Sequence, residues 1–294
     1  MDNKLHTIRD WLRWSVTRFN QEELFFGHGS DNAFDEAAYL ISHALKLPLE
    51  RLDVFFDACL TIAEKERVQK MLELRIDKRL PAAYLTNEAW LGDFCFYVDE
   101  RVIVPRSFIF ELYPDGLNAF LPDHDAVQNV LELCTGSGCL AIMAAHAYPN
   151  AKIIATDISL DALTVAQRNI SDYGLTDRVT LIHSDLFANV PADLRCDLII
   201  GNPPYVTDRD LSALPPEYRH EPCLALAGGE DGMDIVRNLI NDARRFLRPQ
   251  GILVMEIGHN RAYAEAAFPD LPFLWLETST SSDSVFLLHR EELP

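Results

Sequence analysis

Apolar residues in the first 80 positions recur at the spacing of an α-helix. The first stretch of this kind contains Ile8, Leu12, Trp14, Val16 and Phe19. Two more stretches follow at 33–45 and 62–80. Asp31 and Thr61 are their expected N-caps, because a short polar side chain can accept from the first free N–H groups of a helix. We therefore expect a small helical domain over residues 1–85.

A proline ends the helical pattern, and the apolar runs after it favour strands. Residues 90–98 and 101–104 are rich in aromatic and β-branched side chains. They are expected to pair as a β-hairpin that turns at Asp99-Glu100. We assign residues 86–105 to this linking hairpin and residues 106–294 to a larger second domain.

Short apolar runs alternate with helical stretches in the second domain. The runs that favour buried strands are 130–133, 152–156, 179–183, 198–201 and 251–257. After a predicted helix at 260–267, the runs 273–277 and 284–289 are close enough to pair as an antiparallel hairpin. The alternation predicts an α/β fold with five parallel strands and a reversed pair at the end of a seven-stranded sheet.

A glycine-rich turn follows the first strand of this sheet. It reads Cys134-Thr135-Gly136-Ser137-Gly138 and leads into a predicted helix at 140–147. Glycine lets the backbone approach a ligand closely, and the N-terminus of a helix presents free N–H groups. This order of strand, turn and helix is typical of a segment that cradles a nucleotide.

Acidic residues end the next two strands. Asp157 lies 21 residues beyond Gly136, where a carboxylate can accept from both hydroxyls of a ribose. Asp185 follows the third strand, where it can accept from an adenine amino group while Leu186 packs on the ring. These positions predict a site for a cofactor that contains adenosine.

The same turn also fits the pattern G-x-G-x-x-A, through Gly136, Gly138 and Ala141, so a dinucleotide-binding dehydrogenase is an alternative. Three features argue against it. Thr135 and Ser137 stand between the small residues, a corner with two prolines ends the fourth strand, and the chain closes with a reversed strand pair.

The corner after the fourth strand reads Asn202-Pro203-Pro204-Tyr205. Its prolines force the backbone out of the sheet, because each lacks an N–H group and has a fixed φ. Open α/β sheets bind their ligands at this carboxyl edge. Asn202 offers an amide there, Pro203 a carbonyl and Tyr205 an aromatic face, which together suit a flat, amide-like or amino-substituted group. A loop that only ends the strand is the alternative.

The net charge of −19 is concentrated in the second domain. Residues 1–105 carry 13 Lys and Arg against 18 Asp and Glu, a net charge of −5, whereas residues 106–294 carry 13 against 27, a net charge of −14. Binding to nucleic acid usually needs a basic face that displaces counterions from phosphates. The charge therefore disfavours a nucleic-acid partner and favours a basic protein, and solubility alone is the alternative explanation of the acidity.

One group of basic residues lies close together in the sequence of the acidic second domain. It consists of Arg237, Arg244, Arg245 and Arg248. We interpret these arginines as the solvated face of a predicted helix at 231–247, with cations placed favourably at its C-terminal end.

Composition excludes several other classes of protein. No run approaches the roughly 18 apolar residues of a membrane helix, and the first residues lack the apolar core of a signal peptide, so we expect a cytoplasmic protein without a membrane partner. The six cysteines form no Cys-x-x-Cys pair and the nine histidines show no zinc-ligand spacing, so we expect no metal.

These motifs together resemble the glutamine N5-methyltransferases over essentially the whole chain. The resemblance rests on Asn202-Pro203-Pro204-Tyr205, the glycine turn, the segment Val104-Pro105-Arg106-Ser107 and the loop Tyr218-Arg219-His220-Glu221-Pro222. Within the family the sequence is similar to the PrmB type, which modifies a ribosomal protein. The HemK or PrmC type, which modifies release factors, has Pro-Arg-Pro in place of Pro105-Arg106-Ser107. Phe108 departs from the proline expected after Arg-Ser, and Cys134 replaces the first glycine of the usual turn.

The resemblance implies a class I S-adenosylmethionine-dependent methyltransferase fold, with a Rossmann-like seven-stranded sheet in residues 106–294 and S-adenosyl-L-methionine as the cofactor. The implied cofactor-binding residues are Glu132, Cys134, Thr135, Gly136, Ser137, Gly138, Asp157, Ile158, Asp185, Leu186 and Asn202. The implied catalytic residues are Asn202, Pro203, Pro204 and Tyr205, and the implied substrate-binding residues are Ile103, Pro105, Arg106 and Glu221. Glu132 is alternatively a charge at a strand end, and Arg106 is alternatively a tether between the hairpin and the acidic domain.

The function implied is methyl transfer to the side-chain amide nitrogen of a glutamine in a large-subunit ribosomal protein. We expect Asn202 and the Pro203 carbonyl to orient the amide, with Tyr205 stacked on its plane. The alternatives are methylation of a release-factor glutamine, methylation of adenine N6 in a nucleic acid, and a binding module without activity. An adenine methyltransferase would need a basic recognition domain, and a silent module would have a damaged cofactor turn; neither feature is present in the sequence.

Overall fold

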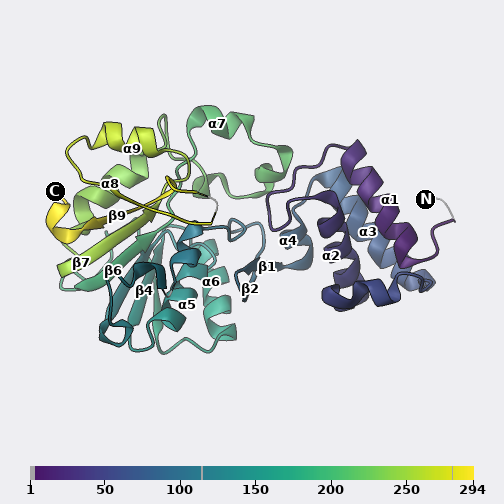
Figure 1. The fold of residues 1–294 in the computed structure, drawn as a ribbon, viewed down its shortest axis with the longest axis horizontal. Coiled ribbons are helices and arrows are strands. Elements are labelled where there is room, and N and C mark those ends of the chain that lie inside the picture. Colours follow the sequence, from purple (N-terminus) through teal and green to yellow (C-terminus); the bar gives the residue numbers. More distant parts are fainter. Residues whose placement is uncertain (1–3, 114, 280) are drawn as a thin grey trace. The chain divides into compact units, whose positions relative to one another are not determined.

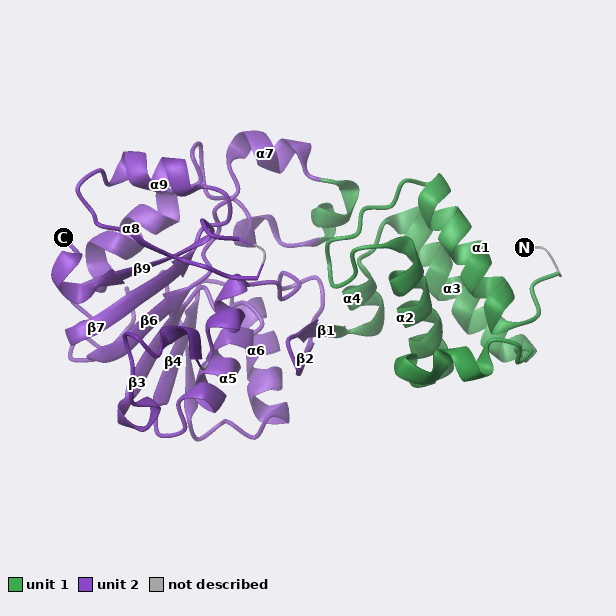
Figure 2. Ribbon diagram, in the orientation of Figure 1, with its two compact units in different colours: residues 1–89, 215–220 green, residues 90–214, 221–294 purple. Residues whose placement is uncertain are grey.

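The computed structural model of the chain describes residues 4–113, 115–279 and 281–294. It divides into two compact units, which are coloured separately in Figure 2. The first unit comprises the chain up to Ala89 together with Pro215–His220, and the second comprises Trp90–Leu214 and Glu221–Pro294. The first unit is therefore built from two separate stretches of sequence.

Helices form the first unit, as the apolar spacing predicts (Figure 1). They are α1 (Ile8–Gln21), α2 (Ala33–Leu45), α3 (Ile62–Lys78) and α4 (Ala82–Thr86). Their apolar faces share one core, in which Phe19, Ile41 and Leu72 are fully buried. Burial of this shared core is the main source of stability for such short helices.

The side chains that cap the N-termini of α2 and α3 can be compared with the predicted caps, Asp31 and Thr61. Thr61 caps α3 through a capping box with Glu64, as predicted. The prediction of Asp31 for α2 is wrong, because the Asn32 side chain accepts from the Asp35 N–H at 2.9 Å. The Asn32 amide also donates to the Asp31 carboxylate at 2.8 Å. Two adjacent residues that both favour N-caps cannot be ranked by their type alone.

A buried ion cluster holds Pro215–His220 in the first unit. Arg75 on α3 is 1% exposed, and it donates to Glu36 on α2 at 2.6 Å and to Glu217 at 3.1 Å. The guanidinium of Arg75 also donates to the Phe25 carbonyl at 2.8 Å. Removing one partner from such a cluster leaves an uncompensated buried charge, which typically costs about 3–5 kcal/mol.

The linking hairpin lies earlier in the chain than predicted. Strands β1 (Glu88–Leu91) and β2 (Phe94–Tyr97) form the two-stranded sheet, so the chain turns at Gly92-Asp93 and not at Asp99-Glu100. Gly92 has a φ of 57°, which a glycine adopts without strain. The carboxylate of Asp99 instead accepts from Arg101 at 2.6 Å, and the run 101–104 forms no strand.

The second unit contains the predicted seven-stranded sheet. Its strands are β3 (Asn129–Leu133), β4 (Lys152–Asp157), β5 (Val179–His183), β6 (Cys196–Gly201), β7 (Leu247–Glu256), β8 (Leu274–Leu276) and β9 (Val285–His289). The spatial order is β5-β4-β3-β6-β7-β9-β8. Strands β3 to β7 are parallel, and β9 pairs antiparallel with both β7 and β8. This topology confirms the expected five parallel strands and reversed terminal pair.

Helices cover both faces of this sheet (Figure 1). They are α5 (Cys139–Ala147), α6 (Leu160–Asp172), α8 (Asp234–Ala243) and α9 (Arg261–Ala267). A further helix of this unit, α7 (Asp208–Ala213), has no buried residue. Val130 of β3 shares a buried cluster with residues of α5 and α6, whereas Leu131 shares a second cluster with residues of α8 and α9. Neighbouring residues of a strand point to opposite faces, so α5 and α6 pack on one face of the sheet and α8 and α9 on the other.

The predicted helix at 231–247 is shorter in the structure, where α8 ends at Ala243 and β7 begins at Leu247. Arg244, Arg245 and Arg248 therefore lie beyond the helix. The four arginines of this group are bonded within the chain, to Asp231 and Asp234 (Arg237), to the Leu293 carbonyl (Arg244), to Asp242 (Arg245) and to Asp197 (Arg248). Their charge is largely matched by neighbouring carboxylates.

Short 3-10 helices complete the described fold. They are Leu49–Phe55, Phe108–Leu112, Asp115–Leu117, His124–Ala126, Pro216–His220, Cys223–Ala225 and Arg290–Glu292. No helix in the described ranges combines the length and apolar character needed to cross a membrane.

Candidate active site

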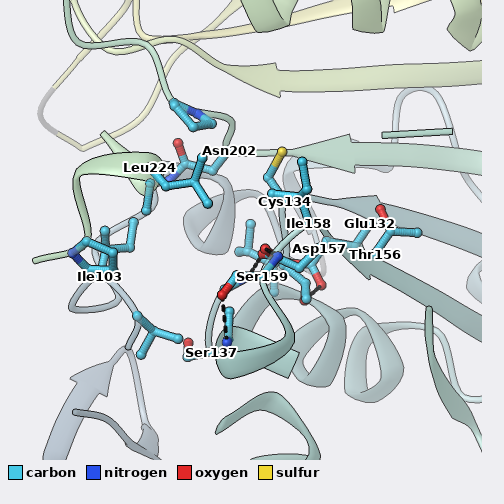
Figure 3. A pocket seen from close by; sticks show the side chains of 18 of the residues that line it. Ile103, Glu132, Cys134, Ser137, Thr156, Asp157, Ile158, Ser159, Asn202 and Leu224 are labelled. Carbon is cyan, nitrogen blue, oxygen red and sulfur yellow. Dashed lines mark hydrogen bonds between the residues drawn. The ribbon is translucent and has the colours of Figure 1, made fainter. Parts of the chain in front are cut away.

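One pocket lies at the carboxyl ends of β3, β4, β5 and β6 (Figure 3). Of the residues singled out from the sequence, those that line it are Ile103, Pro105, Arg106, Glu132, Cys134, Thr135, Gly136, Ser137, Asp157, Ile158, Asp185, Leu186, Asn202 and Pro204. Parallel pairing explains how they meet, because Leu133 at the end of β3 lies beside both Thr156 of β4 and Gly201 of β6. The glycine turn and the Asn-Pro-Pro-Tyr corner thus share one pocket.

Four predicted site residues do not line this pocket. They are Gly138, Pro203, Tyr205 and Glu221. Gly138 is the N-cap of α5, with a φ of 81°, and an added Cβ there would lie 3.2 Å from the Cβ of Ala166 on α6. The absence of a side chain at Gly138 lets α5 and α6 approach each other closely. The contact of Gly138 with the cofactor stays a prediction.

The glycine turn leaves open space on its pocket side. Gly136 has a φ of 55°, and an added Cβ at this position would meet no atom within 4 Å. The Thr135 N–H donates to the Thr156 carbonyl at 2.9 Å, which ties the turn to β4. The turn is therefore held by β4 through Thr135 and leaves free space at Gly136, which a ligand that binds to the backbone of the turn requires.

The Asp157 carboxylate is held in one orientation by backbone N–H groups. One oxygen accepts from Gly136 at 2.9 Å and the other from Ser159 at 2.9 Å. Burial raises the pKa of Asp157, while these N–H groups lower it. Each oxygen keeps a lone pair that can accept from a ligand hydroxyl, which suits the predicted ribose.

Glu132 is a buried acid beneath the turn. Its side chain accepts from the Thr135 hydroxyl at 2.5 Å, and burial raises the pKa of Glu132 to about 8. Thr156 also lines the pocket, and its buried hydroxyl has no hydrogen-bond partner among the described residues. The positive charge of a ligand ammonium group would stabilise the ionised, negatively charged form of Glu132.

The pocket fits S-adenosylmethionine. Three acidic side chains, those of Glu132, Asp157 and Asp185, line it and suit a ligand whose sulfonium and amino groups are both cationic, because a nearby cation favours the ionised form of an acid. Leu186 and the half-exposed Ile158 add apolar surface on which a base can pack. The open space at Gly136 leaves room for the ligand to approach the backbone.

The Asn-Pro-Pro-Tyr corner brings Asn202 to the opposite side of the pocket, near Leu224 in Figure 3. Tyr205 is not among the residues that line the pocket. Its hydroxyl donates to Glu256 at 3.3 Å, and its carbonyl accepts from the Asn260 amide at 2.6 Å. The expected stacking of Tyr205 on the acceptor stays a prediction, because no contact in this structure tests it.

Arg106 forms a two-pronged ion pair with Glu221. The guanidinium donates to the two carboxylate oxygens at 2.5 and 2.7 Å, and Glu221 also accepts from the Val104 N–H at 2.9 Å. The pair connects the Val-Pro-Arg-Ser segment to the loop after the corner. Arg106 still lines the pocket, so the geometry fits both a tether and a substrate contact.

Reasoning from the sequence missed two buried residues beside the pocket. Glu256 at the end of β7 accepts from Ser107, Phe108 and Tyr205. An acid inside the apolar run 252–257 is a signal that could have found it. Asn169 on α6 gave no such signal, because an asparagine on a helix is usually exposed.

No cluster of three or more His, Cys, Asp or Glu in the described part of the chain is arranged to hold a metal ion. All six cysteines are free thiols.

A model of the Methyltransferase small domain matches residues 117–214. Among solved structures, the catalytic domain of hMettl16, in complex with the MAT2A 3′UTR hairpin 6, is similar with a TM-score of 0.51. It is 15% identical, and the match covers 77% of this chain and 80% of that one, so the likeness shows the fold alone. The strand order, the family model and this likeness show the class I methyltransferase fold.

Curated relatives match the chain along nearly its whole length. The ribosomal protein uL3 glutamine methyltransferase of Neisseria gonorrhoeae is 58% identical over 290 residues, which cover 99% of this chain and 96% of the relative. The enzyme with the same name from Burkholderia pseudomallei is 56% identical over 294 residues, with coverage of 98% and 96%. That of Bordetella pertussis is 53% identical over 290 residues, with coverage of 99% and 97%. The chain therefore belongs to the family of ribosomal protein uL3 glutamine methyltransferases.

Proposed function

We propose that this protein transfers a methyl group from S-adenosylmethionine to the side-chain amide nitrogen (N5) of a glutamine in ribosomal protein uL3. The observation that carries the proposal is the convergence of the glycine turn and the Asn-Pro-Pro-Tyr corner on one pocket. The relatives named for this activity support it, because their identity extends over the helical unit as well as the sheet.

An amide nitrogen is a poor nucleophile, because its lone pair is delocalised into the carbonyl group. We propose that the side-chain oxygen of Asn202, which lines the pocket, and the carbonyl of the next residue, Pro203, which does not, each accept one N–H of the glutamine. Both hydrogens are then fixed, and the lone pair points toward the methyl group. Orientation of this kind, together with dipoles that are already in place, lowers the barrier without a strong base.

S-adenosylmethionine supplies an electrophilic methyl group on its sulfonium sulfur. In our proposal Glu132 and the turn residues hold its methionine part, Asp157 holds the ribose, and Asp185 with Leu186 holds the adenine. The pocket wall formed by Ile103, Pro105 and Arg106 contacts the segment that carries the glutamine. As the N–C bond forms, the bond from the methyl carbon to the sulfonium sulfur would break and S-adenosylhomocysteine would be left. One of the two amide protons would then pass to water.

We propose that the acceptor is recognised as a folded, basic protein in the cytoplasm, without direct binding to nucleic acid. The net charge of −14 over residues 106–294 supports a cationic partner. Residues 1–85 are proposed as the recognition domain, 86–105 as the link and 106–294 as the catalytic domain. A peptide with only the target sequence should then give a lower kcat/KM than intact uL3.

A competition experiment tests this function. The protein is incubated with labelled S-adenosylmethionine and equal concentrations of uL3, a release factor and an adenine-containing oligonucleotide, and methylated peptides are mapped by mass spectrometry. We expect label on one glutamine of uL3. Preferential label on the release-factor glutamine would overturn the substrate, and label on adenine would overturn the class of acceptor as well.

A further inference from the structure

Glu256 is a fully buried acid next to the Asn-Pro-Pro-Tyr corner. It is the last residue of β7 and is 1% exposed. The preceding residue, Met255, pairs with Gly201 of β6, and Asn202 follows directly. A carboxylate without access to water is strongly destabilising unless hydrogen bonds replace its hydration. The groups that donate hydrogen bonds to Glu256 therefore indicate the role of its side chain.

Three donors from two distant segments meet on this carboxylate. One oxygen accepts from the Ser107 hydroxyl at 2.5 Å and from the Phe108 N–H at 2.7 Å. The other oxygen accepts from the Tyr205 hydroxyl at 3.3 Å. Glu256 thus joins the segment that includes Pro105 and Arg106 to the corner that includes Asn202.

Tyr205 is enclosed from its other sides. The Asn260 amide donates to its carbonyl at 2.6 Å. An added Cβ on Gly258 would come 2.6 Å from the Tyr205 ring, and one on Gly228 would come 2.7 Å from its Cα. Because backbone and ring are closely surrounded, a movement of the hydroxyl would move the whole corner.

We propose that Glu256 is a positioning residue for the acceptor amide. By accepting from Ser107 and Tyr205 together, it fixes the separation between the Pro105-Arg106 wall of the pocket and Asn202. Glu256 does not line the pocket, so it acts through these residues and not by touching the substrate. The inference rests on the proposed function, since it concerns the placement of the glutamine amide.

The chemistry of the carboxylate agrees with this role. Burial raises the pKa of Glu256 to about 7, whereas the hydrogen bonds from Ser107, Phe108 and Tyr205 lower it. The donors around Glu256 therefore require hydrogen-bond acceptor oxygens more than they require a full negative charge. A glutamine can meet that need, because its oxygen can accept from Ser107 and Phe108 while its amide donates to the Tyr205 hydroxyl.

Two substitutions separate these requirements. Glu256→Leu removes every acceptor at similar volume, and we expect kcat/KM on intact uL3 to fall about 10- to 100-fold, mainly through kcat, because a small misplacement of reacting groups is costly. The Kd for S-adenosylmethionine should stay within about twofold. Glu256→Gln should restore kcat/KM to within about fivefold of the wild type, which a purely ionic role would not allow.

Asp197 supplies a matched control. It is a fully buried acid at the other end of the sheet, on β6, and accepts from the Gln128 and Asn129 N–H groups at 2.9 Å each. Asp197→Leu should lower the thermal midpoint but leave kcat/KM of the folded protein unchanged. If Glu256→Leu behaves in the same way, the positioning role is overturned.

A second measurement decides the matter if Glu256→Leu does not fold. Ser107→Ala and Tyr205→Phe each remove one donor to Glu256. If Glu256 couples the two segments, the loss of kcat/KM in the double variant should differ at least about threefold from the product of the single losses. Losses that multiply simply would overturn the inference. Failure of the wild-type protein to methylate uL3 would instead overturn the proposed function.

Discussion

At the scale of single residues, Asp157 both shapes the cofactor turn and faces its pocket. We expect Asp157→Ala to weaken S-adenosylmethionine binding at least about tenfold, because charge-assisted hydrogen bonds are worth roughly 1.5–3 kcal/mol each. Isothermal titration calorimetry measures the change. Asp157→Asn, which keeps the size and one acceptor, should lose less affinity. Wild-type affinity in the alanine variant would contradict the assignment.

Asn202 tests the acceptor side separately. Asn202→Ala should reduce the rate of methyl transfer on the order of 10²- to 10³-fold, since loss of one preorganised polar partner typically costs that much. Affinity for S-adenosylmethionine should change only a few-fold. Asn202→Asp keeps an acceptor oxygen and should retain partial activity. Full activity of Asn202→Ala in a single-turnover assay would end the proposed role.

Glu132 makes the stability of the ligand-free protein depend on pH. Burial raises the pKa of Glu132 from 4.5 to about 8, so the folded state binds more protons than the unfolded state between these values. The free energy of unfolding must therefore fall as pH rises through this window. In Glu132→Gln the fall should be smaller, as measured by urea denaturation between pH 5 and 8. Equal slopes in both proteins would show that Glu132 does not titrate there.

At the scale of elements, Asn169 on α6 connects the cofactor turn to β2. It is 1% exposed, its amide donates to the Ser137 carbonyl at 2.8 Å and to the Tyr97 carbonyl at 3.0 Å, and its oxygen accepts from the Tyr97 N–H at 2.8 Å. Asn169→Ala leaves these groups without partners, at about 1–3 kcal/mol each. We expect lower stability in urea and weaker cofactor binding. Thr164→Ala, on the exposed face of the same helix, should change neither.

The elements that could be predicted are those whose signal lies in continuous sequence. The glycine turn and the Asn-Pro-Pro-Tyr corner each follow an apolar strand, and parallel pairing brings both to one sheet edge. Glu256 and Asn169 could not be given their roles, because their partners lie far away in the chain. The prediction of a turn at Asp99-Glu100 is wrong because it treats 90–98 as one strand, whereas Gly92 divides that run and its φ of 57° permits the turn there.

At the scale of the whole molecule, net charge governs the encounter with a partner. The chain carries 26 Lys and Arg against 45 Asp and Glu. If uL3 is the cationic partner that we propose, raising the salt concentration should slow association strongly, because the Debye length shortens from about 30 Å at 0.01 M to about 10 Å at 0.1 M. Stopped-flow binding and single-turnover transfer separate association from chemistry. A salt effect confined to the transfer step would contradict this steering.

The buried cluster around Arg75 links the completion of the first unit to the order of protein synthesis. Glu217 follows Arg75 by 142 residues, so Arg75 leaves the ribosome long before its second carboxylate. Until Glu217 has been synthesised, Glu36 is the one of these two carboxylates that is present in the nascent chain. The buried ion cluster of the helical unit can therefore be completed only after most of the sheet has been translated. A fragment that stops at residue 85 lacks Glu217 and leaves the buried Arg75 without its second carboxylate.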